Sequence, residues 1–166
     1  MMKRNLPVAH TVEFDLDTIE LWNLISKPGN LNYSHPYCFS NEIIYWDANE
    51  RSDRLIYLNG RNYVRRFNSW IEYEGYTLTI GEENGPQSFV KWEINVASNN
   101  RSSLTITIYP YILSKFPRIS RKILHKIWIK PRLKKYLKSV LLGLLYYSEN
   151  GSSVPKNHFG EHPWFS

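Results

Sequence analysis

The sequence predicts one α+β domain in which an antiparallel sheet packs against a long C-terminal helix. Apolar and polar residues alternate through most of residues 10–111, which is the period of half-buried strands. Apolar residues then recur every three or four positions from Ile119 to Leu145, which is typical of an amphipathic helix. The chain has 166 residues, enough for one domain that buries roughly 70% of its unfolded surface.

The first strand and the two short helices after it are indicated by local signals. Alternation predicts a strand over residues 10–16. Residues 17–20 match a capping box in its aspartate form, which predicts a helix that ends near Ser26. A proline and a glycine break the chain at residues 27–30. Residues 31–37 then have room for only a turn or two of helix, because Pro36 interferes.

Six further strands follow, so that seven antiparallel strands are expected in all. The turns between them are rich in Gly, Asn and Glu, and Asn59-Gly60 is the strongest hairpin signal. Most of these strands have one apolar face and one polar face, which fits a sheet that is covered on one side. The predicted strands are residues 42–47, 54–58, 61–73, 76–81, 88–97 and 103–111.

The C-terminal helix is expected in two segments. Pro131 lacks an amide hydrogen and must end, kink or restart the helix that begins after Pro117. The second segment is predicted to end near Gly151. We expect residues 1–151 to form the domain and residues 152–166 to form a tail, which carries three large rings and packs back on the domain.

This order of elements resembles the helix-grip fold of the START and pollen-allergen superfamily, often called SRPBCC. The resemblance covers Thr11 to Asn150 and implies a curved seven-stranded sheet wrapped around the long helix. Its members bind lipids, polyketides or quinones in a cavity between sheet and helix, and some catalyse cyclisation or dehydration there. None of the family-like residues is a catalytic motif: Leu21-Trp22, His35-Pro36, Asn59-Gly60, Arg65-Arg66, Trp70-Ile71 and Tyr136 to Tyr147.

A strongly curved sheet cannot bring its whole concave face against one helix, so a gap lined by apolar side chains is expected. Each methylene group that a ligand buries in such a gap contributes roughly 0.8 kcal/mol. Alternation and helical spacing place the following residues around it: Tyr45, Tyr63, Arg65, Phe67, Trp92, Ile106, Tyr136, Val140 and Leu144.

Arg65 and His35 are the polar candidates. Arg65 is in register with inward-facing residues, and a buried guanidinium must pair with a carboxylate of the protein or with an oxygen of a ligand. The alternative is that Arg65 reaches the rim or that a bulge turns it outward. His35 precedes Pro36, near the expected mouth of the cavity, and has the chemistry of a general base. The alternative is a histidine that lines a gate or the surface.

No cofactor or metal is expected. His158 to His162 fit the H-x-x-E-H pattern of a zinc protease, but that pattern requires a helix, which Gly160 and Pro163 oppose. Cys38 has no neighbour that indicates a nucleophile, so an inert thiol is expected. One cysteine cannot form an intramolecular disulfide, and the N-terminus lacks the apolar core of a signal peptide, so we expect a cytoplasmic protein.

The positive charge belongs to one element. The net charge is +6, and no Asp or Glu lies between Ile94 and Ser148, a stretch rich in Lys and Arg. Such a helix suits peripheral contact with anionic lipid head groups. We expect no nucleic-acid partner, because neither an RNA-binding strand signature nor a helix-turn-helix pattern is present. The plain alternative is a solvated helix face.

Three functions are therefore compatible with the sequence. The first is binding or transport of a hydrophobic small molecule that is lipid-like, polyketide-like or isoprenoid-like. The second is a cyclase or dehydratase that uses the same cavity. The third is a protein-interaction module with a filled core and a basic helix as its working surface.

Overall fold

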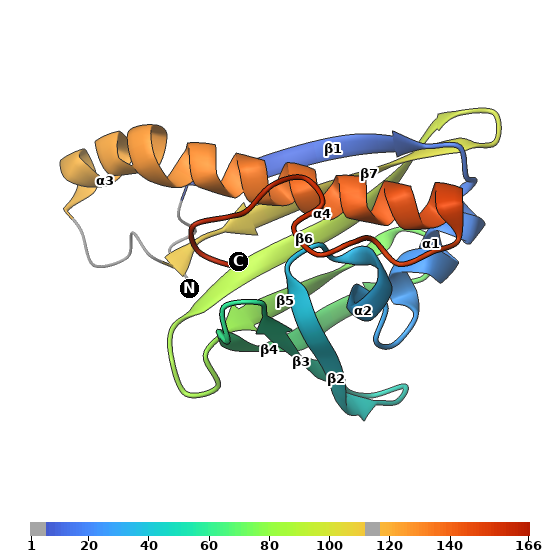
Figure 1. The fold of residues 1–166 in the computed structure, drawn as a ribbon, viewed down its shortest axis with the longest axis horizontal. Coiled ribbons are helices and arrows are strands. Elements are labelled where there is room, and N and C mark those ends of the chain that lie inside the picture. Colours follow the sequence, from blue (N-terminus) through green and yellow to red (C-terminus); the bar gives the residue numbers. More distant parts are fainter. Residues whose placement is uncertain (1–5, 112–116) are drawn as a thin grey trace.

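Seven antiparallel strands form one curved sheet around a long C-terminal helix in the computed structural model (Figure 1). The structure describes residues 6–111 and 117–166, with only the backbone of Arg118 and Ile119. The strand order β1-β7-β6-β5-β4-β3-β2 makes β2 to β7 a meander, and β1 returns to pair with β7. The predicted fold class is confirmed. The strands are β1 (Val8–Phe14), β2 (Cys38–Trp46), β3 (Arg51–Tyr57), β4 (Asn62–Ile71), β5 (Gly75–Gly81), β6 (Gln87–Ser98) and β7 (Arg101–Tyr109).

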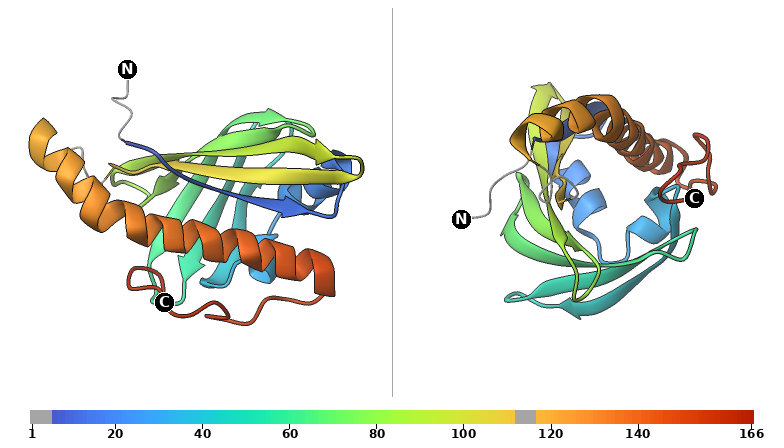
Figure 2. Two further views of the ribbon diagram at one scale, coloured as in Figure 1. Left: turned by 90° about the horizontal axis from the view of Figure 1, so that it is seen from above. Right: turned by 90° about the vertical axis from the view of Figure 1, so that its left-hand side faces the viewer.

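Two short helices, α1 (Thr18–Ser26) and α2 (Leu31–Ser34), close one end of the sheet (Figure 2). The predicted capping box is present at α1. The Asp17 carboxylate accepts from the Glu20 N–H at 2.8 Å, and the Glu20 carboxylate accepts from the Asp17 N–H at 3.0 Å. The α1 helix buries an apolar face that includes Trp22. The α2 helix lies between β2 and the long helix.

The long helix is continuous through the predicted break at Pro131. It consists of α3 (Arg118–Leu124), a π-helical turn η2 (His125–Ile129) and α4 (Lys130–Asn150). The π-helical turn lies just before Pro131, and the Lys130 N–H donates to the His125 carbonyl five residues earlier. The wider turn thus accommodates a residue that has no amide hydrogen. The helix ends as predicted, at Asn150, where the Gly151 N–H donates to the Tyr147 carbonyl.

The α4 helix and α2 approach each other closely at Gly143. A Cβ atom at this position would collide with the Ser34 carbonyl oxygen and lie 2.9 Å from Pro36 Cδ. Only glycine therefore allows the loop that carries His35 to reach the helix surface. Below this contact, the concave face of the sheet and the apolar face of α4 form the core, which includes Leu104, Leu137 and Leu141.

Residues 152–166 run back along α4 toward its N-terminal half (Figure 2). Backbone hydrogen bonds tie this tail to the α2 region, from the Val154 N–H to the Tyr33 carbonyl (2.9 Å) and from the Asn157 N–H to the Pro36 carbonyl (3.0 Å). Its end is buried through Phe165, which is 7% exposed. Among the helices of the described residues, none is long and apolar enough to cross a membrane.

Candidate ligand-binding site

A pocket of about 90 Å³ remains between the concave face of the sheet, α4 and the tail. Strands β3 to β7 supply most of its wall, and α4 supplies the facing side. The wall is mainly apolar, with rings and aliphatic side chains in alternation along each strand. The core is therefore not completely filled, although the pocket is smaller than the several hundred Å³ typical of sites for drug-sized ligands.

Most of the residues predicted to line a cavity do lie on this pocket. The sheet contributes Tyr63, Arg65, Trp92 and Ile106, the α4 helix contributes Tyr136 and Val140, and the loop after α2 contributes His35.

Three predicted residues lie elsewhere. Tyr45 is 56% exposed, because a β-bulge between Ile43 and Tyr45 shifts the pairing with β3 and turns the end of β2 outward. Phe67 is half-buried and packs edge-on against Trp46, Trp70 and Tyr76 instead of against the pocket. Leu144 is fully packed in the core, one turn of α4 beyond Val140.

Three polar side chains form a hydrogen-bonded chain in the pocket wall. His35 Nε2 lies 3.0 Å from the Tyr136 hydroxyl, which lies 3.0 Å from the Tyr57 hydroxyl. The Tyr37 N–H donates to His35 Nδ1 at 3.2 Å, so Nδ1 is an acceptor and the imidazole hydrogen is on Nε2. The Nε2–H therefore donates to Tyr136. In the contact between the two hydroxyls only one tyrosine can donate its hydrogen to the other. The second phenolic hydrogen therefore has no acceptor among these three side chains.

Burial keeps these three hydrogen-bonded side chains uncharged. Desolvation lowers the pKa of His35 to about 3, and the positive charges of Arg65 and Lys156 act in the same direction. Desolvation also raises the pKa values of Tyr57 and Tyr136 above their ordinary range. At neutral pH the imidazole is therefore neutral and both phenols keep their hydrogens. The three side chains can thus offer a ligand a hydrogen bond but not a charge.

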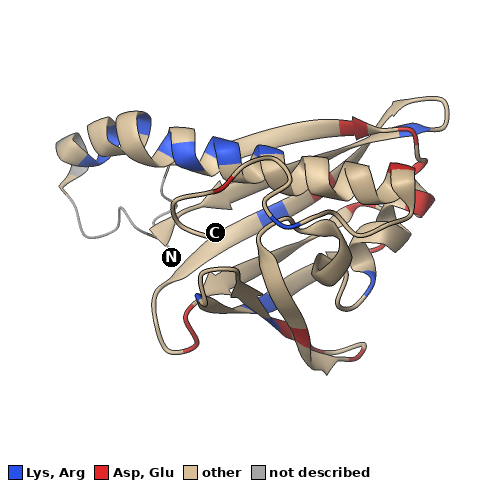
Figure 3. Cartoon of the chain, viewed as in Figure 1, with Lys and Arg blue, Asp and Glu red and all other residues tan. Residues whose placement is uncertain are grey.

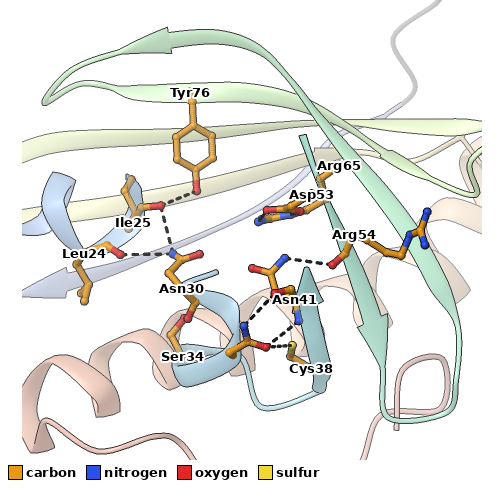
Figure 4. A network of polar contacts seen from close by, with 11 residues as sticks. Leu24, Ile25, Asn30, Ser34, Cys38, Asn41, Asp53, Arg54, Arg65 and Tyr76 are labelled. Atoms are coloured by element: carbon orange, nitrogen blue, oxygen red, sulfur yellow. Dashed lines mark hydrogen bonds and ion pairs between the residues drawn. The ribbon is translucent and has the colours of Figure 1, made fainter. Parts of the chain in front are cut away.

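Arg65 is buried and paired, as one of the sequence-based alternatives required. Its Nε donates to Asp53 Oδ1 at 2.7 Å and its Nη2 donates to Asp53 Oδ2 at 2.5 Å (Figure 4). The two residues are direct cross-strand neighbours on β4 and β3. Burial alone would lower the pKa of Arg65, but the charge and hydrogen bonds of Asp53 outweigh burial and raise it. Arg65 also lines the pocket, and its two hydrogen bonds to Asp53 use Nε and Nη2 rather than Nη1.

Asparagine side chains hold the elements around this ion pair in place (Figure 4). The Asn30 amide donates to the Ile25 carbonyl at 3.2 Å and fixes the loop between the short helices. Asn32 pairs with the backbone of Asn41 on β2 through two hydrogen bonds of 2.9 and 2.7 Å. Asn41 in turn donates to the Arg54 carbonyl at 3.2 Å. These contacts anchor β2 and the loop that carries His35 to the strand that carries Asp53.

The end of the tail closes the pocket on the side where α4 and the β3–β4 loop meet. Trp164 and Phe165 both line it. The Phe165 ring lies 4.5 Å from the rings of both Tyr57 and Tyr136, measured between centroids. The sequence indicated that the tail packs through its rings, but it gave no sign that they reach this pocket. Tyr57 was likewise missed, although it alternates with Leu55 on the inward face of β3.

The other sequence candidates have no place in this site. Cys38 is buried, and desolvation raises its pKa to about 11, so it is a thiol at neutral pH. The H-x-x-E-H segment is not helical, and His162 Nε2 donates to the Arg132 carbonyl instead. Within residues 6–111 and 117–166, no group of three His, Cys, Asp or Glu side chains is placed to hold a metal ion.

No family model and no curated protein matches the chain, but solved structures match its fold. A START superfamily protein from Mycobacterium smegmatis is 13% identical, with a TM-score of 0.68 over 88% of this chain and 99% of that protein. DynU16, from the dynemicin biosynthetic locus, is 15% identical with a TM-score of 0.61 over 89% of this chain. The di-domain ARO/CYC protein BexL, from the BE-7585A biosynthetic pathway, is 12% identical with a TM-score of 0.66 over 87% of this chain.

The chain spans about half the length of the last two proteins, 48% of DynU16 and 46% of BexL. At these identities the matches establish the architecture: a curved antiparallel sheet, two short helices after the first strand and a long C-terminal helix. The chain therefore has the helix-grip fold of the START superfamily.

Proposed function

We propose that this chain binds a hydrophobic small molecule in the pocket between the sheet and α4, as a binding or carrier protein. The observation that supports this most is an apolar pocket whose wall contains a few directed hydrogen-bond donors. Ligand sites generally combine apolar walls, which supply affinity, with a few polar groups, which fix orientation. A protein-interaction module with a filled core is disfavoured because the pocket is retained.

The donors in the wall favour a neutral ligand that carries an acceptor oxygen. One phenolic hydrogen of the Tyr57–Tyr136 pair has no acceptor in the hydrogen-bonded chain, and Arg65 uses only Nε and Nη2 toward Asp53. Asp53 already neutralises Arg65, so a carboxylate ligand would bring an unbalanced charge into the pocket. A carbonyl or ether oxygen of a lipid-like, polyketide-like or isoprenoid-like molecule satisfies the donors without that penalty.

A cyclase-like or dehydratase-like enzyme is the second candidate. The same donors would polarise a carbonyl group, and BexL, which has a similar fold, is a di-domain ARO/CYC protein. Proton transfer, however, works best with a group whose pKa lies near the working pH. His35 is shifted far below neutrality and the two tyrosines above it, and both ring nitrogens of His35 are occupied. We therefore propose binding first and catalysis second.

Native mass spectrometry of the protein purified from cells tests this proposal, followed by organic extraction of the bound material. We expect a co-purifying apolar molecule, or a rise in melting temperature with neutral aryl ketones that is absent with the matching aryl carboxylates. A product formed from an added polyketide-like substrate would favour the enzyme. No bound molecule and no thermal shift with either set would refute the proposal.

We further propose that the chain is cytoplasmic and that it touches anionic membranes through α3, η2 and the first half of α4. Lys and Arg gather on this part of the molecule, whereas acidic residues lie elsewhere (Figure 3). The exposed lysines Lys122, Lys126 and Lys130 share it with Ile123, Ile127 and Trp128, which are 56%, 71% and 44% exposed. Lysines near an anionic surface contribute about 1 kcal/mol each, and an exposed tryptophan suits the interface.

Flotation with lipid vesicles tests the membrane proposal. The chain should bind vesicles of phosphatidylcholine with phosphatidylglycerol and should not bind phosphatidylcholine alone. Ile127→Asp should weaken this binding, whereas Val96→Asp is the matched control, because Val96 is 75% exposed on a strand rather than on the basic helix. Equal binding of both variants, or binding that ignores lipid charge, would contradict it.

A further inference from the structure

Trp164 and Phe165, near the end of the tail, line one side of the pocket, and we propose that Phe165 limits the size of the ligand that the pocket accepts. This inference rests on the proposed binding function and adds a residue that determines specificity. The general helix-grip pattern of strands and helices ends at Asn150, so the limit is set by a segment outside that pattern.

Phe165 fills space that would otherwise belong to the pocket. Its ring is stacked on Tyr57 at an interplanar angle of 29° and tilted by 44° against Tyr136, with both centroids at 4.5 Å. These are the two tyrosines that carry the unpaired phenolic hydrogen. A ligand oxygen that accepts this hydrogen therefore has its carbon skeleton next to the Phe165 ring. Removing the ring lengthens the pocket at the point where the ligand is anchored.

The end of the tail is fixed rather than loosely placed. The Trp164 carbonyl accepts from Asn59 Nδ2 on the β3–β4 loop at 2.8 Å. His162 is 1% exposed; its Nδ1 accepts from the Trp164 N–H at 3.2 Å, and its Nε2 donates to the Arg132 carbonyl at 3.0 Å. These bonds join the segment to both sides of the pocket, the sheet and α4. Phe165 is thus held at one position, as a residue that limits size must be.

The small volume of the pocket agrees with this role. About 90 Å³ accommodates a compact ligand, whereas sites for larger lipid-like or polycyclic molecules occupy several hundred Å³. With Phe165 in place, a ligand can grow only along the remaining apolar wall. With a smaller side chain at position 165, the space beside Tyr57 and Tyr136 opens toward the surface.

A series of aryl methyl ketones measures this size limit. Each member has one neutral acceptor oxygen, and each has one fused ring more than the member before it. The probes are acetophenone, 2-acetonaphthone and 2-acetylanthracene, with Kd obtained by calorimetry. The wild-type chain should bind acetophenone, the smallest ketone, most tightly and bind 2-acetylanthracene at least tenfold more weakly. Phe165→Ala should bind 2-acetylanthracene at least tenfold more tightly than the wild type does. Phe159→Ala is the matched control, because Phe159 lies in the same tail but not on the pocket.

The outcomes separate the two proposals. If no ketone binds any variant, the binding function itself fails. If ketones bind and the order of affinities is the same in wild type, Phe165→Ala and Phe159→Ala, the binding function stands and the role of Phe165 is refuted. Circular dichroism must show that Phe165→Ala is folded; if it is not, Phe165→Leu replaces it and is expected to shift the preference by a smaller factor in the same direction.

Discussion

Replacing Asp53 by asparagine should destabilise the fold more than any exposed charge change. Asp53 is 0% exposed and Arg65 is 4% exposed, and two hydrogen bonds of 2.7 and 2.5 Å join them. A hydrogen bond to a charged group contributes about 1.5–3 kcal/mol, so two of them amount to about 3–6 kcal/mol. Breaking buried ion pairs by removing one partner typically costs about 3–5 kcal/mol. We therefore expect Asp53→Asn to lower the free energy of unfolding by about 3–5 kcal/mol.

Urea denaturation followed by tryptophan fluorescence measures this loss. Asp15→Asn is the matched control, because Asp15 accepts from Arg101 Nε at the same 2.7 Å but is exposed. Exposed pairs contribute at most about 1 kcal/mol. The double variant Asp53→Leu with Arg65→Met should lose much less than Asp53→Asn, since it leaves no unpaired charge in the core. A loss below about 1 kcal/mol for Asp53→Asn would refute the reasoning.

Three further predictions follow from the pocket and the helix contact. Tyr136→Phe leaves the His35 Nε2–H without an acceptor, so it should lower the free energy of unfolding in urea by about 1–3 kcal/mol and weaken binding of acetophenone; an unchanged stability would contradict the hydrogen bond between His35 and Tyr136. Below pH 6.5 the unfolded chain protonates His35 while the folded chain does not until about pH 3, so His35 alone should cost about 1.4 kcal/mol of stability for each unit by which the pH falls in that window, and His35→Gln should reduce the slope by about that amount. Gly143→Ala should lower the melting temperature despite the better helix propensity of alanine, whereas Ser148→Ala should not; a stabilised Gly143→Ala would contradict the close contact with Ser34.

The sequence predicted the elements well because each carries a local signal. Alternation identified the strands, the capping box identified α1, and helical periodicity identified the C-terminal helix. At Pro131 the local signal was correct, since the residue cannot continue a regular helix. The response of the backbone, a π-helical turn at His125–Ile129 that keeps the helix continuous, has no sequence signal of its own.

The partner of Arg65 depends on the length of one loop. A two-residue loop at Asn59-Gly60 would place Arg54 opposite Arg65. The hairpin instead closes between Tyr57 and Arg61, with a three-residue loop that ends in Gly60 at φ +81°. The register moves by one residue, and Asp53 takes the position opposite Arg65. Hairpin signals identify a turn, but side-chain packing decides between these two registers.

The site residues that the sequence missed belong to long-range contacts. The bulge that turns Tyr45 outward arises in the pairing of β2 with β3, and its position has no simple sequence signature. Phe165 meets Tyr57 across more than a hundred residues of chain, and only the path of the tail brings them together. Periodicity shows which side of an element faces inward, but it does not show which distant segment covers that side.

The most direct test of the binding proposal is to locate a small ketone on the folded protein in solution. Nuclear Overhauser effects between acetophenone and methyl-labelled protein should connect the ligand protons to Leu137, Val140 and Ile106, which line the interior. Contacts confined to exposed methyl groups such as Ile123 and Ile127, or no contacts at saturating ligand, would contradict it.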